Sequence, residues 1–579
     1  MARFGSWMSM FALIALAISA GSHAHAQGGF DRALDLVPSD AAGFICVPSL
    51  KRLNDDLYQC IERMDRPATS VLGRPLDQLK ARLGISVAVN DRGSLLAWWP
   101  VADAAGVAGE VRMLVPTEDP EAFLRANFEA VPESGPNAVR GLDEQVWFAR
   151  SIDGHVLLSP DAAAVADYDA AGGMSDRLRA RVAGGWNELD LIVWGGPAAM
   201  RDLAKPGRMA LVDGVEPPPG FDLEAAERWR KALATSLAEG LVTIDVDPLG
   251  LAIRTRADLM PDSPLAAMVA DSSPGAARLD RVPEAPFYLA GSIDLAALGG
   301  AAPLRGFAKL AGLPEGMWLE VAENLKQAQL AIYPSKLGIA AGGFFNDASL
   351  AIEAEDLGAL REAIETGVGK AGGDAAGMRW SGTFERDRTL KNGREVDAFE
   401  VSQSAIPAGE ADAIGAVDLA QRQLVWQIVF GSRGLNGFFE PAGGEWSVVT
   451  FSQRPDVLGR AIEAAANPGP GLDRNGAIRA LRQWLPEGAQ MVGFLGVGQF
   501  GKLIKQISRM IPGGGDAPLP EIRENIEPVA FGVSIGPTVV ESAVVIPAGV
   551  LGLGFDQVME AAMQRLTMPS EPAPVEPAS

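Results

Sequence analysis

Short apolar segments bounded by turn residues recur along the chain and lead into amphipathic helices. The stretch 36–50 has a Pro-Ser-Asp turn, the apolar strand Phe44–Val47 and then a helix with apolar positions every three or four residues. The stretches 282–295 and 485–500 have the same form. This recurrence predicts one structural unit that begins three times.

Three pairs of alternating segments are joined by residues that favour tight turns. The turns are Asp153-Gly154, Asn392-Gly393 and Asp247-Pro-Leu-Gly250. They predict β-hairpins, so antiparallel pairing is frequent. We therefore expect the α+β class, with repeated domains of antiparallel sheet and helices packed on one face.

The repeats are long and unequal, which indicates duplicated domains rather than a solenoid. A chain of 579 residues is also too long for one hydrophobic core. The expected divisions are a signal peptide at 1–26, an N-terminal α+β domain at 27–275, a second α+β domain at 276–470, a shorter C-terminal α+β repeat at 471–566 and a disordered Pro-rich tail at 567–579.

The first residues are typical of a secretory signal peptide. Arg3 precedes a mostly apolar run at 8–20, and Ala24-His25-Ala26 places small residues where a signal peptidase reads them. Cleavage is therefore expected between Ala26 and Gln27. No later stretch approaches the roughly 20 apolar residues that a membrane-spanning helix needs. We expect an exported protein, periplasmic or extracellular, with no transmembrane segment in the mature chain.

The charge balance narrows the class of partner. The chain has 50 Lys and Arg against 73 Asp and Glu, a formal net charge of −23. Nucleic-acid binding depends on a basic surface, so this balance excludes nucleic acid as the expected partner. By the same argument, it disfavours docking on anionic lipid headgroups.

Cys46 and Cys60 are the two cysteines of the chain. Export permits a disulfide, and an even count fits one. Cys46 lies in the predicted strand and Cys60 on the apolar face of the helix that follows, so a strand packed under its helix would bring them close. Two buried free thiols are the alternative.

Three pattern matches suggest chemistry, and each has a simpler structural interpretation. Gly532–Gly536 matches the G-x-S-x-G nucleophile elbow, but strand residues follow it and no His does. Gly367–Gly372 matches G-x-G-x-x-G, but it follows a helix instead of a strand, which predicts a helix end and a loop. Asp245 and Asp247 suit Ca²⁺ as oxygen ligands, but a solvated strand face explains them as well.

Histidine is scarce, which weighs against several catalytic classes. After signal cleavage only His155 remains, directly behind the Asp153-Gly154 turn. Zinc sites draw on several His or Cys ligands, and Ser-His-Asp chemistry would have to use His155. We therefore expect no catalytic, metal-binding or cofactor-binding residues and no cofactor.

Four stretches resemble large uncharacterised exported proteins of planctomycete-type bacteria. They are LVPSDAAGFICVPSLKRL, RLGI before a strand, VPTEDPEAFLRANF and IDGHVLLSPDAAAVADY. The resemblance covers most of the mature chain. It implies no reaction and no ligand, because that family has no assigned activity, and it transfers no site residues.

We expect an exported, non-catalytic binding or structural protein of the cell envelope. Its partner would be an envelope protein or a small apolar ligand held at the seams between repeated domains, which are common places for pockets. One alternative is an envelope hydrolase with an acid pair or a site that depends on His155. Another is a periplasmic carrier of lipid or another apolar ligand, suggested by the 48% apolar composition.

Overall fold

The computed structural model describes residues 33–553 with internal gaps. The gaps are 65–76, 78–79, 81–84, 86, 102–109, 142–143, 170–173, 180–188, 204–222, 311–320, 376–377, 407–415, 468, 470, 511–521 and 524. The predicted signal peptide, its cleavage point at Ala26 and Gln27, and the Pro-rich tail all lie outside the described residues.

One sheet of 21 strands forms the scaffold of the protein. The first ten strands in the chain are β1 (Ala41–Val47), β2 (Leu95–Pro100), β3 (Arg112–Pro116), β4 (Glu129–Ala130), β5 (Ala138–Arg140), β6 (Val146–Ile152), β7 (His155–Ser159), β8 (Leu191–Gly195), β9 (Leu237–Asp247) and β10 (Gly250–Leu259). The others are β11 (Leu289–Asp294), β12 (Leu325–Tyr333), β13 (Asp347–Ala354), β14 (Gly373–Ala375), β15 (Met378–Thr389), β16 (Glu395–Ala405), β17 (Leu435–Gly443), β18 (Trp446–Thr450), β19 (Met491–Leu495), β20 (Val529–Ile535) and β21 (Val539–Pro547).

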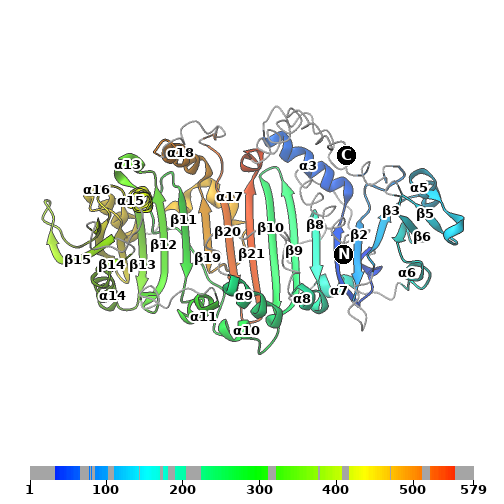
Figure 1. The fold of residues 1–579 in the computed structure, drawn as a ribbon, viewed down its shortest axis with the longest axis horizontal. Coiled ribbons are helices and arrows are strands. Elements are labelled where there is room, and N and C mark those ends of the chain that lie inside the picture. Colours follow the sequence, from blue (N-terminus) through cyan, green and yellow to red (C-terminus); the bar gives the residue numbers. More distant parts are fainter. Residues whose placement is uncertain are drawn as a thin grey trace, which may run out of the picture.

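The sheet consists of two halves with the same connectivity (Figure 1). In the first half β1 lies between β2 and β8, β9 and β10 follow β8, and β3 leads outward to β7, β6, β5 and β4. In the second half β11 lies between β12 and β19, β20 and β21 follow β19, and β13 leads outward to β18, β17, β16 and β15. All these pairs are antiparallel, and β14 adds an edge strand to β15.

The halves join through their last strands, because β10 pairs with β21 along its length from Gly250 to Asp258. These two strands hold equivalent places, so the junction has the form of an isologous dimer interface within one chain. Strands β19 to β21 occupy the places of β8 to β10. The structure therefore contains two repeats where the sequence suggested three, and the pairing of β19 with β11 crosses the expected domain limit at 470. The stretch 485–500 leads into a counterpart of β8, not of β1.

The α+β class and the antiparallel sheet are confirmed. The helices are α3 (Leu50–Met64), α5 (Pro120–Asn127), α6 (Ala162–Ala166), α7 (Met174–Arg179), α8 (Pro197–Leu203), α9 (Leu223–Ser236), α10 (Pro264–Met268), α11 (Ala302–Leu310), α13 (Gly338–Gly342), α14 (Leu357–Lys370), α15 (Ala416–Phe430), α16 (Pro455–Ala466), α17 (Gly476–Arg482) and α18 (Val497–Ser508), with short 3₁₀ turns at Pro132–Ser134 and Leu472–Arg474.

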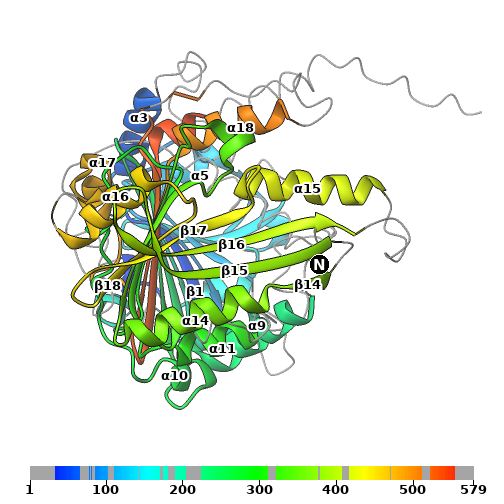
Figure 2. The ribbon, with the colours of Figure 1, turned by 90° about the vertical axis from the view of Figure 1, so that its left-hand side faces the viewer.

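Helices pack on both faces of the sheet, not on one face as predicted from the sequence. We call face A the side that carries Cys46, and face B the side that carries Ile45. Helices α6, α7, α16 and α17 pack on face A, and α3, α5, α9, α10, α11, α14 and α18 pack on face B. Figure 2 shows α16 and α17 on one side of the strands and α15 on the other. Helices pack on both sides because successive strand residues point to opposite faces and are apolar on each.

No disulfide joins Cys46 and Cys60, and both are buried free thiols, which is the alternative that the sequence left open. Cys46 lies on face A in a cluster with Phe44 and Trp98. Cys60 lies on α3, which packs against Ile45 and Val47 on face B. The sheet therefore separates the two thiols, because neighbouring residues of a strand point to opposite sides.

Candidate functional site: an open apolar sheet face

The centre of face B is apolar across seven adjacent strands, from β9 through β10, β21, β20, β19 and β11 to β12. Directly paired residues lie on the same face of a sheet, so the register identifies them. They form three rows: Ile244, Ile253, Val544, Phe531, Gly493, Gly291 and Leu330; Val246, Leu251, Ile546, Val529, Leu495, Leu289 and Ile332; and Val242, Thr255, Ser542, Val533, Met491, Ile293 and Ala328. We call these positions the open apolar face. None of them is charged.

Most positions of the open apolar face are at least partly exposed to solvent. Phe531 is 45% exposed and Val544, paired with it, is 39% exposed. Most of the other positions are half-buried, although each would fit a protein core. The Phe531 ring lies over Gly493, where any Cβ atom would clash with it. Large exposed apolar patches on soluble proteins mark binding sites, so this face is the leading candidate.

The opposite side of the same strands carries buried apolar residues, among them Ala530 and Phe494, together with charged residues on β10 and β21. On face A, Arg256 pairs with Glu541 at 3.0 Å, across the junction of the two halves. The Arg254 guanidinium lies 5.2 Å from the centre of the Trp484 ring and donates to the Trp484 carbonyl. Face A of the central strands is thus covered by α16 and α17 and mixed in polarity, whereas face B is uncharged and partly exposed. The solvated side of an antiparallel sheet is normally polar, so an exposed side without charge is unusual.

The polar pair Thr255 and Ser542 lies within the open apolar face at the junction of the halves. Their hydroxyl oxygens are 2.7 Å apart, so the two side chains satisfy each other. The row that contains them borders the helices α9 to α11, where Trp229 stacks on Phe307 at 5.8 Å. On the other side, Leu289 and Leu330 border α18 through the cluster that contains Leu503.

At the far end of the second half, face B passes under α14, and an open cavity of about 550 Å³ lies between the helix and the strands. Ile364 and Val368 of α14 lie on one side of it, and Trp380, Val401 and Leu435 of the strands lie on the other. The helix approaches β15 closely enough that only glycine fits at Gly382, against the Val368 carbonyl. The volume lies in the range of small-molecule sites, about 300–1,000 Å³. Lys370 is the single charged residue of the lining.

Two of the three motif matches have the structural roles that their simpler interpretations predict, but Asp245 does not lie on a solvated strand face, because its side chain is only 14% exposed. Ser534 is a strand residue of β20. The glycine run from Gly367 includes the end of α14, and several of its residues line the cavity under that helix. Asp247 accepts the N–H groups of Leu249 and Gly250 within the β9–β10 turn.

His155 does not form a triad among the described residues. It is 8% exposed, and its Nδ1 lies 3.1 Å from the carbonyl oxygen of Asp153. Burial lowers its pKa, so the imidazole is neutral at pH 7. Such burial also keeps the ring from a substrate, but the hydrolase alternative stays a prediction.

A cluster of carboxylates lies beneath α3 around Arg52. The Arg52 Nε lies 2.9 Å from Asp56 Oδ2 and 3.7 Å from Asp190 Oδ1, and its Nη2 lies 3.5 Å from Asp245 Oδ1. Burial raises the pKa of Asp190 well above its ordinary value and that of Asp245 to about 6. Asp56 and Asp190 are each 1% exposed, so a substrate cannot reach them in this state.

The described part of the chain holds no group of three or more His, Cys, Asp or Glu side chains placed to bind a metal ion. Within the same residues, no helix combines the length and apolar character needed to cross a membrane.

The open apolar face was not predicted from the sequence. Its strands were recognisable, but alternation of Val, Phe and Ile normally indicates a buried side. No signal within these strands shows that the side stays uncovered.

The comparisons with known proteins leave the family open. No family model matches the chain, and no curated protein matches it. Two solved structures of TP0453, crystal forms I and IV, are similar at 10% and 9% identity, with TM-scores of 0.21 and 0.20. Each match covers 40% of this chain, and they cover 79% and 85% of the respective TP0453 chains. A likeness at this level carries no argument about fold or function.

Proposed function

We propose that the protein binds a ligand with a long hydrocarbon chain on the open apolar face, as a non-catalytic binding protein of the cell envelope. The observation that carries the proposal is the exposed pair Phe531 and Val544 at the centre of an uncharged sheet face. The cavity under α14 supports it, because it offers a mostly apolar hollow on the same face.

The chemistry of the face selects hydrocarbon over polar ligands. Each methylene group removed from water contributes about 0.8 kcal/mol, and the face has no charged side chain to compete for that contact. A polar ligand would lose hydrogen bonds to water and find only the Thr255 and Ser542 hydroxyls, which already bond each other. A peptide has no free strand edge here, because β10, β21, β20 and β19 are each paired on both sides.

Fluorescence titration with cis-parinaric acid, a polyene fatty acid, tests the proposal. The probe is expected to bind the unaltered protein and to bind the double variant Phe531→Ser/Val544→Ser at least tenfold more weakly. Both substitutions keep the strand and remove apolar contact area at exposed positions.

Val87→Ser is the matched control, because Val87 is 49% exposed but lies away from the central strands. It is expected to leave the affinity unchanged. Equal affinities of the unaltered protein and the double variant would contradict the proposal, as would an equal loss in the control.

A further inference from the structure

A second exposed apolar surface lies on α13, α15 and α18, which share one core. Ile339 of α13, Ile428 of α15 and Leu503 of α18 belong to the same cluster. The amide N–H groups of Phe344 and Phe345 donate to the carbonyls of Ile428 and Val429, and so join the end of α13 to α15. Figure 1 shows α13 and α18 along one long edge of the molecule, with α15 next to α13. We call this surface the basic edge.

Each of these helices presents a large apolar side chain to solvent. Leu337, next to α13, is 57% exposed, Val425 of α15 is 59% exposed and Ile504 of α18 is 40% exposed. Among the described residues, three of the eight bulky apolar side chains that are exposed to solvent therefore lie on neighbouring elements. Single exposed apolar residues are ordinary, but a group on one edge indicates an interaction surface.

The same surface is basic, against the acidic balance of the chain. The segments 335–346, 423–434 and 497–510 contain no Asp or Glu, and their five basic residues are Lys336, Arg433, Lys502, Lys505 and Arg509. The whole chain has 73 acidic residues against 50 basic ones, so this distribution reverses the general trend. A potential of this kind attracts anions locally even though the net charge repels them.

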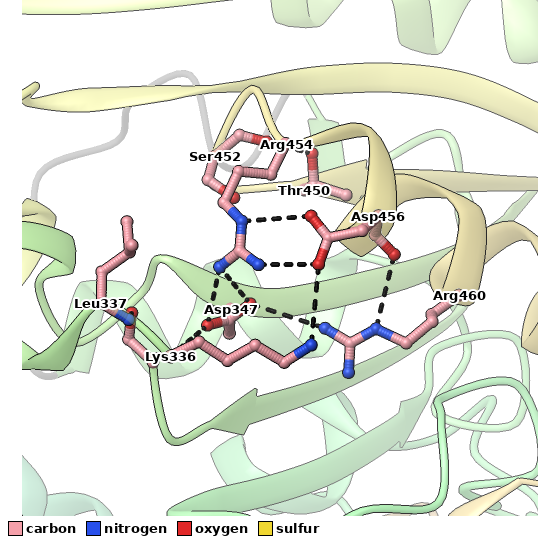
Figure 3. Close-up of polar contacts among 9 residues, drawn as sticks. Lys336, Leu337, Asp347, Thr450, Ser452, Arg454, Asp456 and Arg460 are labelled. Carbon is pink, nitrogen blue, oxygen red and sulfur yellow. Dashed lines mark hydrogen bonds and ion pairs between the residues drawn. The ribbon is translucent and has the colours of Figure 1, made fainter.

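A buried carboxylate holds the loop that carries Leu337 (Figure 3). Asp347 is 2% exposed, and its Oδ2 accepts the backbone N–H of Lys336 at 3.0 Å. Arg454 bonds both oxygens of Asp347 at 3.0 and 3.2 Å, and Arg460 lies 3.5 Å away. Asp456 pairs with Arg454 and lies 3.8 Å from the Lys336 Nζ. The charges of Arg454 and Arg460 balance those of Asp347 and Asp456, so the network holds Lys336 and Leu337 in place without changing the net charge of the basic edge.

We infer that the basic edge docks on an anionic lipid surface. Apolar side chains that project between cationic ones are the arrangement by which peripheral proteins enter the headgroup region, and basic residues near such a surface contribute about fivefold each to binding. This contradicts the expectation from net charge, because the contact involves only the local field within about a Debye length. The inference does not depend on the proposed ligand of the open apolar face.

Sedimentation with vesicles tests the inference on the full chain. We expect binding to mixed phosphatidylglycerol and phosphatidylcholine vesicles, weaker binding to phosphatidylcholine alone, and release by added salt. Lys505→Glu/Arg509→Glu is expected to lower the partition coefficient at least tenfold, and Leu337→Ser/Ile504→Ser at least fivefold. Lys391→Glu, in the exposed turn between β15 and β16, is the matched charge control and should bind like the unaltered protein.

The variant Phe531→Ser/Val544→Ser separates this inference from the proposed function. It should keep vesicle binding even where it loses the fatty acid. Equal binding to both kinds of vesicle, or unchanged binding by the Lys505→Glu/Arg509→Glu variant, would overturn the docking surface and leave the fatty-acid site untouched.

Discussion

Replacing Asp245 by Asn should stabilise the protein at alkaline pH. The Asp245 side chain is 14% exposed, and burial, opposed by Arg52 and Arg254, raises its pKa from 3.8 to about 6. Two pH units correspond to roughly 3 kcal/mol of preference for the neutral form in the folded state. The folded protein therefore holds this proton more tightly than the unfolded chain. Stability contributed by the neutral carboxyl is lost as the pH rises from about 4 to about 7.

Asn has nearly the same shape as Asp and carries no charge, so the variant avoids this loss. Asp245→Asn is expected to raise the free energy of unfolding by about 2–3 kcal/mol at pH 8 and to leave it almost unchanged at pH 4. Urea unfolding followed by tryptophan fluorescence measures both values. Asp55→Asn, in an exposed pair with Lys51, is the control and should change stability by less than about 1 kcal/mol at either pH. A less stable Asp245→Asn protein at pH 8 would refute the reasoning, because the attraction of Arg52 would then outweigh desolvation.

Two further predictions concern burial. Phe494→Ala should lower the free energy of unfolding by about 3–5 kcal/mol, because Phe494 is 0% exposed on face A. Phe531→Ala, on the neighbouring strand, should lower it by only about 1 kcal/mol, because Phe531 is partly exposed. Equal losses in urea unfolding would mean that face B is covered in solution. Titration with a thiol reagent in the absence of reductant should detect no reactive thiol in the folded protein and two after denaturation. The reason is that burial raises the pKa of Cys60 to about 12 and that of Cys46 well above its ordinary value. Fewer than two thiols after denaturation would indicate that Cys46 and Cys60 form a disulfide.

Local structure followed from the sequence wherever one short segment determines it. The Asp153-Gly154 turn joins β6 and β7, and the Asp247 turn joins β9 and β10, as predicted. Both turns depend on backbone conformations that Asp and Gly favour, which neighbouring residues hardly alter. The strand at Cys46 and the helix at Cys60 were correct for the same reason.

Arrangement over long distances did not follow from the sequence. A turn, an apolar strand and a helix describe both β1 and β19, so the pattern could not show that 485–500 completes the second repeat. The sequence could not decide between a disulfide and two free thiols, because the side on which α3 packs depends on contacts of the whole sheet. The open apolar face was missed because Phe531 and Val544 have the alternation of buried residues, and only the arrangement of distant helices leaves them exposed.

The pairing of β10 with β21 has a consequence for how the protein is made. Synthesis proceeds from the N-terminus, so the first ten strands emerge before residues 539–547 exist. Until then β10 has one unpaired edge, and unpaired strand edges recruit other chains. A second nascent chain offers the same strand in a self-complementary arrangement. Folding that waits until the C-terminal strand is present would therefore protect this protein against intermolecular strand exchange.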